Sequence, residues 1–210
     1  MFVSEFQKVG QDLFLRGLVS SHGGNMSLRL GDGLVITRRG AQLGHLSERD
    51  LIETGVEWND RATPSASSEL AIHRAIYQRT QAQAIIHAHP IYALALTLLE
   101  DEIVPLDAEG RQSLGRIPVV GSDVIMQVRD VIDEVAALLP ECRIVVVRGH
   151  GSFAIGQLLD EAHRWTSMME ESARLIATVR LLGGGTGRKR RSNRSRELAS
   201  LVAAATQPAG

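Results

Sequence analysis

The stretch that says most about this chain is Ala84-Ile85-Ile86-His87-Ala88-His89-Pro90. Its apolar first half predicts a buried strand, and the proline predicts the end of that strand because it has no backbone N–H to donate. Side chains two residues apart on a strand point to the same face. His87 and His89 are therefore expected to face one point at a strand end, where a single metal ion could bind both. The alternative is that they are ordinary hydrogen-bonded loop residues.

A third histidine is expected in the same kind of position. The run Ile144-Val145-Val146-Val147 predicts a strand, and the glycine-flanked turn that follows is Arg148-Gly149-His150-Gly151. Three imidazoles with an open fourth position are typical of a catalytic zinc ion, since structural zinc sites are usually closed and rich in cysteine. His87, His89 and His150 together therefore predict a metal site.

Glu69 is the acidic residue expected beside these histidines. It ends the segment Pro64-Ser65-Ala66-Ser67-Ser68-Glu69, just before a helical apolar pattern that runs to Tyr77. Ser67 or Ser68 would cap that helix and place Glu69 in its first turn, where the helix dipole favours a negative charge. Helix amino termini also bind phosphate, so the serines could hold an anion beside the metal. The alternative is a solvent-exposed glutamate.

A second candidate anion loop is Ser21-His22-Gly23-Gly24-Asn25, which follows an amphipathic helix and precedes a hairpin over residues 26–37. Its adjacent glycines would let backbone N–H groups turn toward one point, although most such turns are only turns. Further along, apolar spacing predicts a helix from Ser122 to Leu139 and a long helix from Asp160 to Leu182. Alternating strands and helices with hairpin signals predict a mixed sheet covered by helices.

Composition predicts a cytoplasmic enzyme with one core. The chain has 210 residues, of which 44% are hydrophobic, and its single cysteine, Cys142, precludes an intrachain disulfide. Neither a signal sequence nor a membrane-spanning apolar run is visible, so no membrane partner is expected.

The carboxy-terminal residues differ in composition from the rest. We expect one domain over residues 1–182 and a flexible Gly- and Arg-rich tail over 183–210 with a marginal helix. The formal net charge of the whole chain is −1, although residues 188–196 are strongly basic. A solvated tail is the expected interpretation. Nucleic-acid binding is disfavoured because no aromatic residues are interleaved with the arginines.

Taken together, these features make the chain resemble the class II aldolase/adducin family, in particular the zinc-dependent L-fuculose-phosphate aldolases. The resemblance extends from the first helix to Leu182. Its landmarks, in order, are Gly24-Asn25-Met26-Ser27, Ile36-Thr37 with Gly40, Ser67-Ser68-Glu69, His87-Ala88-His89 and Gly149-His150-Gly151.

The resemblance implies a zinc ion with three histidine ligands, and a glutamate, Glu69, that is both a detachable fourth ligand and the acid/base. The histidine ligands would be His87, His89 and His150. The substrate phosphate would lie among Gly24, Asn25, Gly40, Ser67 and Ser68. Mn²⁺ and Co²⁺ are alternatives to Zn²⁺. The family fold is a three-layer α/β/α sandwich with a mostly antiparallel central sheet, and the family usually forms a homotetramer with active sites at subunit interfaces.

Two departures from the family pattern bear on the substrate. Arg39 precedes Gly40 where the family usually has a small hydroxylated residue. It would strengthen phosphate binding, bind a carboxylate instead, or be a solvated surface charge. Residues 104–110 contain no tyrosine, although the bacterial fuculose-phosphate enzymes supply one there from a neighbouring subunit as proton donor. Asp107 or Glu109 would take that role, unless both are ordinary loop acids.

The implied reaction is cleavage of a ketose 1-phosphate, of the fuculose 1-phosphate or 5-methylthioribulose 1-phosphate type, to dihydroxyacetone phosphate and an aldehyde. Alternatives on the same fold are a methylthioribulose-1-phosphate dehydratase and a sugar-phosphate 4-epimerase, although epimerases usually carry aspartate in place of Glu69. A non-catalytic adducin-like interaction domain is a third alternative, against which the metal ligands argue. Of the histidines outside the metal pattern, His73, four residues after Glu69 on the same helix, is the one expected nearest the site, although a packed core residue is the favoured interpretation.

Overall fold

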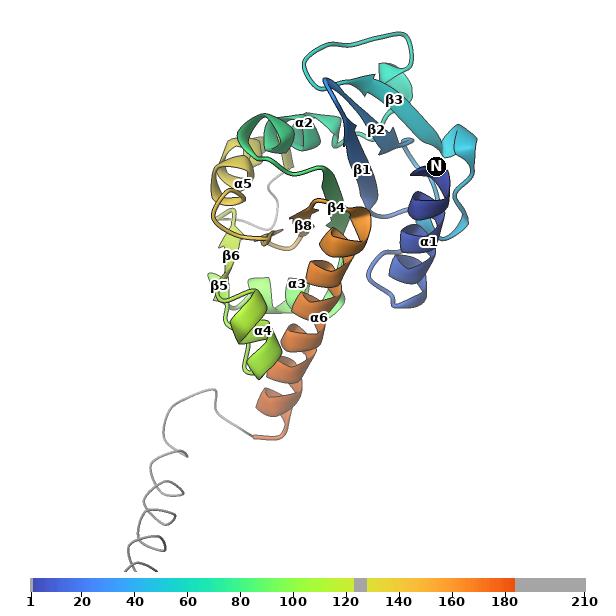
Figure 1. Ribbon diagram of the computed structural model, residues 1–210. Helices are drawn as coiled ribbons and strands as arrows, with labels where there is room; N and C mark the ends of the chain where they lie inside the picture. The colour runs from blue at the N-terminus through green and yellow to red at the C-terminus, as the bar shows by residue number, and fades with distance from the viewer. Residues whose placement is uncertain (1, 123–127, 184–210) are drawn as a thin grey trace, which may run out of the picture. The chain divides into compact units, whose positions relative to one another are not determined.

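Strand β4 (Ala84–Ala88), which carries His87, lies inside the sheet and is paired on both sides. In the computed structural model, which describes residues 2–122 and 128–183, eight strands form a sheet in the order β3-β2-β1-β4-β8-β7-β6-β5 (Figure 1). The other strands are β1 (Asn25–Leu30), β2 (Gly33–Thr37), β3 (Leu51–Gly55), β5 (Glu102–Ile103), β6 (Ile117–Val120), β7 (Ile144–Val147) and β8 (Gly151–Gly156). Neighbouring strands are antiparallel except β6 and β7, which are parallel.

Helices cover both faces of this sheet. They are α1 (Phe2–Leu15), α2 (Leu70–Arg79), α3 (Ile91–Thr97), α4 (Ala108–Ser113), α5 (Ile132–Leu138) and α6 (Leu159–Leu181). Short 3-10 segments are Leu43–His45, Glu48–Asp50, Thr63–Ser65 and Val128–Asp130.

Helices α2 and α5 share one hydrophobic core with the sheet, to which Ile85 and Phe153 contribute. On the opposite side, where α6 begins beside α1, the Leu159 amide donates a hydrogen bond to the Glu5 carboxylate at 3.0 Å (Figure 1). The predicted α/β/α sandwich with a mostly antiparallel sheet is confirmed.

The register of three strands brings site residues to one end of the sheet. Asn25 on β1 lies opposite His87, and Phe153 on β8 lies opposite the same histidine from the other side. Gly151 begins β8 beside the histidine pair. A Cβ atom there would come within 2.5 Å of His87 Cε1 and 2.8 Å of His89 Cδ2. Because only glycine fits at this position, the turn after β7 can pass close to both histidines.

Helix α5 is shorter than the sequence indicated. Apolar spacing predicted one helix from Ser122 to Leu139, but the chain makes a 3-10 turn at Val128–Asp130 and α5 begins only at Ile132. Val131, between these two segments, is buried and has non-helical torsion angles of φ −119° and ψ 7°. Apolar spacing reports which residues are buried, and it does not show where the backbone leaves a helix. Residues 123–127 of the predicted helix lie outside the described part of the chain.

The chain divides into two compact units, Met1–Leu175 and Ile176–Gly210. Of the second unit, the structure describes residues 176–183, which include the end of α6. The predicted tail beyond residue 183, with its basic stretch over 188–196, lies outside the described residues. Within the described ranges, no helix is both long enough and apolar enough to cross a bilayer.

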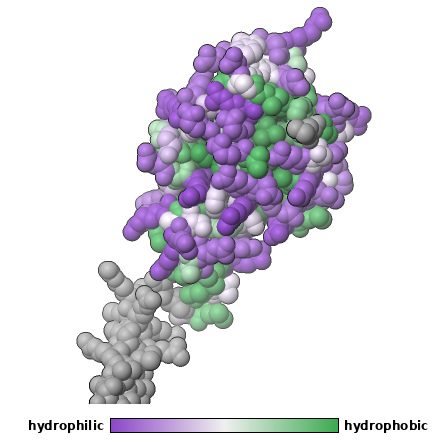
Figure 2. Space-filling model, viewed as in Figure 1, coloured by the Kyte–Doolittle hydropathy of each residue, from purple (hydrophilic) through white to green (hydrophobic). Residues whose placement is uncertain are grey.

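The surface carries both polar and apolar side chains. Hydrophilic residues dominate the face shown in Figure 2, with hydrophobic patches between them. Among the large apolar residues that the structure leaves exposed are Ile91 on α3, and Leu98 and Leu99 directly after that helix.

Candidate metal centre

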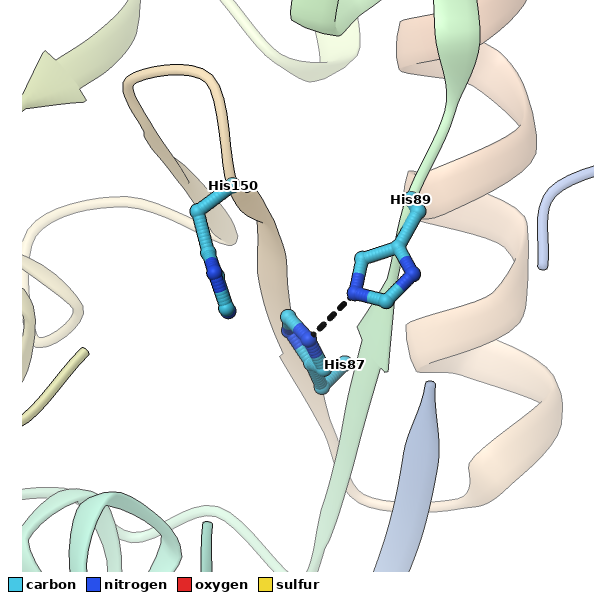
Figure 3. A group of neighbouring side chains, drawn as sticks. All are labelled: His87, His89 and His150. Atoms are coloured by element: carbon cyan, nitrogen blue, oxygen red, sulfur yellow. Dashed lines mark hydrogen bonds between the residues drawn. The ribbon is translucent and has the colours of Figure 1, made fainter. Parts of the chain in front are cut away.

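The three histidines predicted from the sequence meet at one point. His87 comes from β4, His89 follows that strand, and His150 comes from the turn between β7 and β8 (Figure 3). One ligand nitrogen from each lies within 4.8 Å of the others. The Nε2 atoms of His87 and His89 are 2.9 Å apart. Imidazole nitrogens gathered this closely are suited to bind one divalent metal ion.

His87 is held in the form that binds a metal. Its Nδ1 donates a hydrogen bond to the Ser152 carbonyl oxygen at 3.1 Å, which leaves the lone pair of Nε2 facing the other histidines. Its buried ring stacks on Phe153, with centroids 4.4 Å apart. Burial lowers the pKa of His87 to about 3, so the imidazole is neutral at physiological pH. Burial also lowers the pKa of His89.

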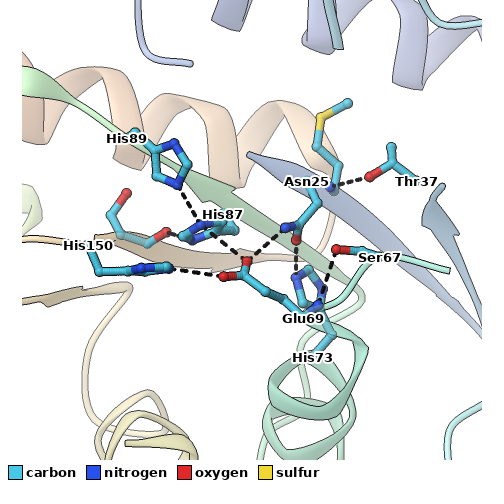
Figure 4. A network of polar contacts seen from close by, with 10 residues as sticks. Asn25, Thr37, Ser67, Glu69, His73, His87, His89 and His150 are labelled. Carbon is cyan, nitrogen blue, oxygen red and sulfur yellow. Dashed lines mark hydrogen bonds and ion pairs between the residues drawn. The ribbon is translucent and has the colours of Figure 1, made fainter. Parts of the chain in front are cut away.

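Glu69 joins the cluster through its carboxylate. One carboxylate oxygen lies 3.1 Å from Nε2 of His87, the other lies 2.9 Å from Nε2 of His150, and Asn25 Nδ2 donates to the group at 2.7 Å (Figure 4). Burial raises the pKa of this carboxyl, but the nearby His87 and the hydrogen bonds from His150 and Asn25 outweigh burial and lower the pKa to about 2. Glu69 is therefore ionised at neutral pH.

The helix that follows Glu69 begins later than the sequence predicted. Helix α2 starts at Leu70, so Glu69 is the N-cap residue and not part of the first turn. Ser67 Oγ accepts a hydrogen bond from the Glu69 amide at 3.3 Å and does not cap the helix. The Glu69 carbonyl accepts the first hydrogen bonds of the helix. Glu69 itself has non-helical torsion angles, and its side chain points to the histidines (Figure 4). Serine capping preferences could not reveal that the carboxylate has a stronger partner elsewhere.

The donor set fits a divalent metal such as zinc. Imidazoles and a carboxylate supply nitrogen and oxygen donors without a thiolate, which suits zinc and related cations. Ligand atoms at about 2.0–2.1 Å from a tetrahedral zinc ion lie roughly 3.3 Å from one another. The separations of 2.9 Å between the His87 and His89 nitrogens and 3.1 Å from His87 to Glu69 are only slightly shorter. Small side-chain adjustments would therefore admit such an ion.

The two later segments predicted to bind phosphate are paired in the fold. The Arg39 amide donates a hydrogen bond to the Ser65 carbonyl at 3.0 Å, which brings the loop around Gly40 beside the serines. Gly40 has a φ of +70°, a conformation that favours glycine. The side chains of Arg39 and Ser68 are exposed, whereas Ser67 is buried. The two predicted anion segments therefore run side by side, with Ser67 opposite Thr37.

The earlier anion loop is joined to the metal side of the site. Gly24 has a φ of +78°, and a Cβ atom there would lie 2.8 Å from the His87 carbonyl oxygen. The Asn25 side chain donates through Nδ2 to Glu69, and its Oδ1 accepts from His73 at 2.6 Å. Both polar groups of this amide are thus engaged within the protein. Asn25 holds Glu69, a role that its place in a predicted phosphate loop did not indicate.

The two candidates for a second proton donor lie at the start of α4. The Asp107 carboxylate caps this helix, accepting from the Gly110 amide at 2.6 Å and from Ser172 Oγ at 2.7 Å. Burial raises the pKa of Asp107, but these hydrogen bonds outweigh burial and lower it. Glu109 is exposed in the first turn of α4. Asp107 therefore has a structural use in this chain, and Glu109 is the more accessible acid.

His73 is a buried residue with a hydrogen-bonding role that the sequence did not reveal. It was predicted to be a packed core residue, and it is fully buried, but both ring nitrogens are engaged. Nδ1 lies 2.7 Å from Ser27 Oγ, and Nε2 lies 2.6 Å from Asn25 Oδ1 (Figure 4). Burial lowers the pKa of His73 to about 4. Its position four residues after Glu69 on the same helix indicated that it lies near the site, but not which groups it contacts.

Solved structures with the same fold define the class of protein. The crystal structure of L-fuculose-1-phosphate aldolase from Thermus thermophilus matches with a TM-score of 0.81 and 36% identity, over 89% of this chain and 98% of that chain. The fold is thus that of an aldolase-type enzyme. Residues 4–177 match the family Class II Aldolase and Adducin N-terminal domain, and the chain belongs to this family.

Two further relatives have names that denote different reactions. The L-fuculose phosphate aldolase of Methanocaldococcus jannaschii is 31% identical over 173 residues, which are 81% of this chain and 93% of that protein. The 3-oxo-tetronate 4-phosphate decarboxylase of Pectobacterium atrosepticum is 31% identical over 182 residues, which are 82% of each. Identity at this level does not choose between the two reactions, so the choice depends on the residues of the site.

Proposed function

We propose that the protein is a metal-dependent class II aldolase that cleaves a ketose 1-phosphate to dihydroxyacetone phosphate and an aldehyde. The observation that carries the proposal is the ionised Glu69 carboxylate, which contacts two of the clustered histidines. We take Zn²⁺ as the ion bound by these residues, with Mn²⁺ and Co²⁺ as alternatives. Its ligands would be His87, His89, His150 and Glu69. Fuculose 1-phosphate and 5-methylthioribulose 1-phosphate are the substrate types that we favour.

Glu69 would exchange the proton that the reaction requires. When bound, the metal ion supplies a Lewis acid for the carbonyl and hydroxyl oxygens of the ketose. Cleavage removes the proton of the hydroxyl that becomes the aldehyde oxygen, and a second acid/base group would accept that proton. Glu69, after taking up a proton from solvent, would pass it to the carbon of the dihydroxyacetone phosphate half. A substrate that displaces the carboxylate would also separate it from the Asn25 amide, whose hydrogen bond lowers its pKa, while the burial that raises the pKa persists. Displacement therefore turns a resting anion into a better proton carrier.

The substrate phosphate would bind at the paired anion segments. Gly24, Gly40, Ser67, Ser68 and the backbone of Asn25 would surround it. Arg39, exposed on the same loop as Gly40, would add a charge-assisted contact. This arrangement would put the phosphate beside the metal, because Ser67 and Ser68 directly precede Glu69.

We also propose that the enzyme is a cytoplasmic homotetramer with active sites between subunits. The exposed side chains of Ile91, Leu98 and Leu99 support burial against another copy. Glu109 from a neighbouring subunit would then be the second acid/base group, which accepts the hydroxyl proton in cleavage and is the proton donor in the reverse aldol addition. Sedimentation should give four times the 22.8 kDa mass of one chain, and a monomer in solution would contradict this assembly.

Decarboxylation of a 3-oxo acid phosphate is the second candidate reaction. Loss of carbon dioxide also leaves negative charge beside a carbonyl group, so the same metal and Glu69 would serve it. Arg39 and the similarity to the decarboxylase of Pectobacterium atrosepticum favour it.

Dehydration of methylthioribulose 1-phosphate and 4-epimerisation are weaker alternatives, and Glu69 in place of aspartate argues against the epimerase. The cluster of His87, His89 and His150, which could hold a metal ion, argues against a non-catalytic adducin-like domain.

The test is a product assay on zinc-loaded protein. A panel of ketose 1-phosphates is offered, and dihydroxyacetone phosphate is measured, with carbon dioxide from 3-oxo-tetronate 4-phosphate measured in parallel. The aldolase proposal predicts release of dihydroxyacetone phosphate that stops when a chelator removes the metal. Carbon dioxide release without any aldol cleavage would replace the aldolase with the decarboxylase.

A further inference from the structure

A continuous row of hydrogen bonds leads from Glu69 into the core. Asn25 Nδ2 lies 2.7 Å from Glu69, and Asn25 Oδ1 lies 2.6 Å from His73 Nε2. On the far side of the imidazole, Nδ1 lies 2.7 Å from Ser27 Oγ, which lies 2.7 Å from the Tyr77 hydroxyl. Ser27, His73 and Tyr77 are at most 1% exposed. Their side-chain polar groups are thus cut off from water and depend on each other.

The row is formed by one face of a helix against one face of a strand. Glu69, His73 and Tyr77 are spaced four residues apart at the start of and along α2, so they share a helix face. Asn25 and Ser27 are two residues apart on β1 and share a strand face. Each β1 side chain therefore bridges consecutive members of the α2 set.

The chemistry of each group fixes the direction of these hydrogen bonds. A carboxylate can only accept, so the Asn25 NH₂ group faces Glu69 and its carbonyl oxygen faces His73. That oxygen also accepts, so His73 carries its proton on Nε2. In the neutral imidazole, Nδ1 then accepts from the Ser27 hydroxyl, and the Ser27 oxygen accepts from Tyr77. No member can reverse its role without breaking the row.

We propose that His73, Ser27 and Tyr77 are positioning residues that fix the orientation of the Asn25 amide and, through it, hold the Glu69 carboxylate at the metal centre. The proposal deepens the proposed function and rests on it. An Asn25 amide turned by 180° would present its oxygen to Glu69, which would repel the carboxylate. His73 prevents this turn because its Nε2–H requires the amide oxygen. Outer partners of metal ligands typically contribute about 10–100-fold to metal affinity or activity.

The test measures zinc affinity by competition with a chelator, so that it does not depend on turnover. His73→Phe removes both hydrogen bonds but keeps a planar ring, and it should weaken zinc binding about 10-fold or more. His73→Gln keeps an N–H directed at Asn25 and should recover most of the affinity. The matched control is Thr166→Val, which deletes a buried hydroxyl bonded only to the Ala162 carbonyl among the described contacts. That control should leave zinc affinity unchanged.

A double-mutant cycle with Asn25→Ala separates positioning from a general loss of packing. If His73 acts through Asn25, His73→Phe should weaken zinc binding in the wild-type background and have almost no further effect in the Asn25→Ala background. An equal effect in both backgrounds, or no effect in either, would overturn the proposal. Should His73→Phe fail to fold, Tyr77→Phe, which removes only a hydroxyl, enters the same cycle under the same criteria.

Failure of the proposed function would be recognised separately. His89→Ala should abolish the high-affinity zinc site in the same competition assay. If wild-type and His89→Ala bind zinc equally, the metal is bound elsewhere, and both the metal centre and the positioning role are overturned. If His89→Ala abolishes binding while the His73 cycle is additive, only the positioning role is overturned.

Discussion

The two halves of the candidate site are built in opposite ways. The metal half stands on strand ends and a helix start, with His87 and Glu69 largely buried. The anion half includes exposed loop side chains, Arg39 and Ser68. A rigid, buried half fixes the chemistry, whereas exposed loop residues can vary and select the substrate. Substitutions in the metal half should therefore change turnover by orders of magnitude, and those in the anion half should mainly change KM.

The largest effect is expected from His89→Ala. This change removes one of three nitrogen donors from a site that has no spare ligand of that kind among the described residues, so the metal and turnover should both be lost. The fold should persist, because His89 follows β4 and is only partly buried. Metal content, turnover and thermal unfolding are the measurements. The exposed His45→Ala is the control and should behave as wild type. Retention of stoichiometric zinc by a His87→Ala/His89→Ala double mutant would locate the site elsewhere.

Glu69→Gln should separate chemistry from metal binding within the buried half. The amide cannot carry the proton, so turnover should fall by about 10²–10⁴-fold. Metal should remain bound through the histidines, which would supply three of the four proposed ligands. Single-turnover kinetics with metal analysis on the same sample would measure both. Turnover near that of the wild type would exclude Glu69 as the acid/base.

The buried histidines should also make the fold sensitive to acid. Burial lowers the pKa of His73 from its ordinary value of 6.5 to about 4, so the folded protein binds fewer protons than the unfolded chain between these pH values. This contribution to the free energy of unfolding is complete above pH 6.5 and is lost as the pH falls through about 4. It amounts to roughly 3 kcal/mol. Urea unfolding of chelator-treated protein from pH 7.5 to 4 should show the decline, and His73→Phe should make it less steep, with the remainder due to His87 and His89. An unchanged slope in that variant would assign the decline to other groups.

The smallest effect is expected in the exposed half, from Arg39→Ala. A charge-assisted contact to phosphate contributes about 1.5–3 kcal/mol, so KM for a phosphorylated ketose should rise about tenfold while turnover changes little. The exposed Arg61→Ala is the matched control. A change in KM below about twofold would make Arg39 a solvated surface charge. Loss of activity only toward a carboxylated substrate would favour the decarboxylase.

The same contrast explains what could be predicted from the sequence. His87, His89 and His150 were found because strand periodicity and strand ends determine where such side chains point. The mostly antiparallel sheet followed from the family resemblance carried by these motifs. The role of Asn25 could not be found, because it depends on the register of β1 against β4 and on His73 from a helix distant in sequence. The break at Val131 was missed because the apolar spacing of the sequence continues across it.

The claim that the buried half is a metal centre is tested most directly by anomalous diffraction at the zinc absorption edge, from crystals of the zinc-loaded protein. We expect one anomalous peak per chain, at about 2.0–2.1 Å from a ring nitrogen of each of His87, His89 and His150. A zinc peak bound by other residues, or full zinc content in solution with no peak at these histidines, would contradict the account.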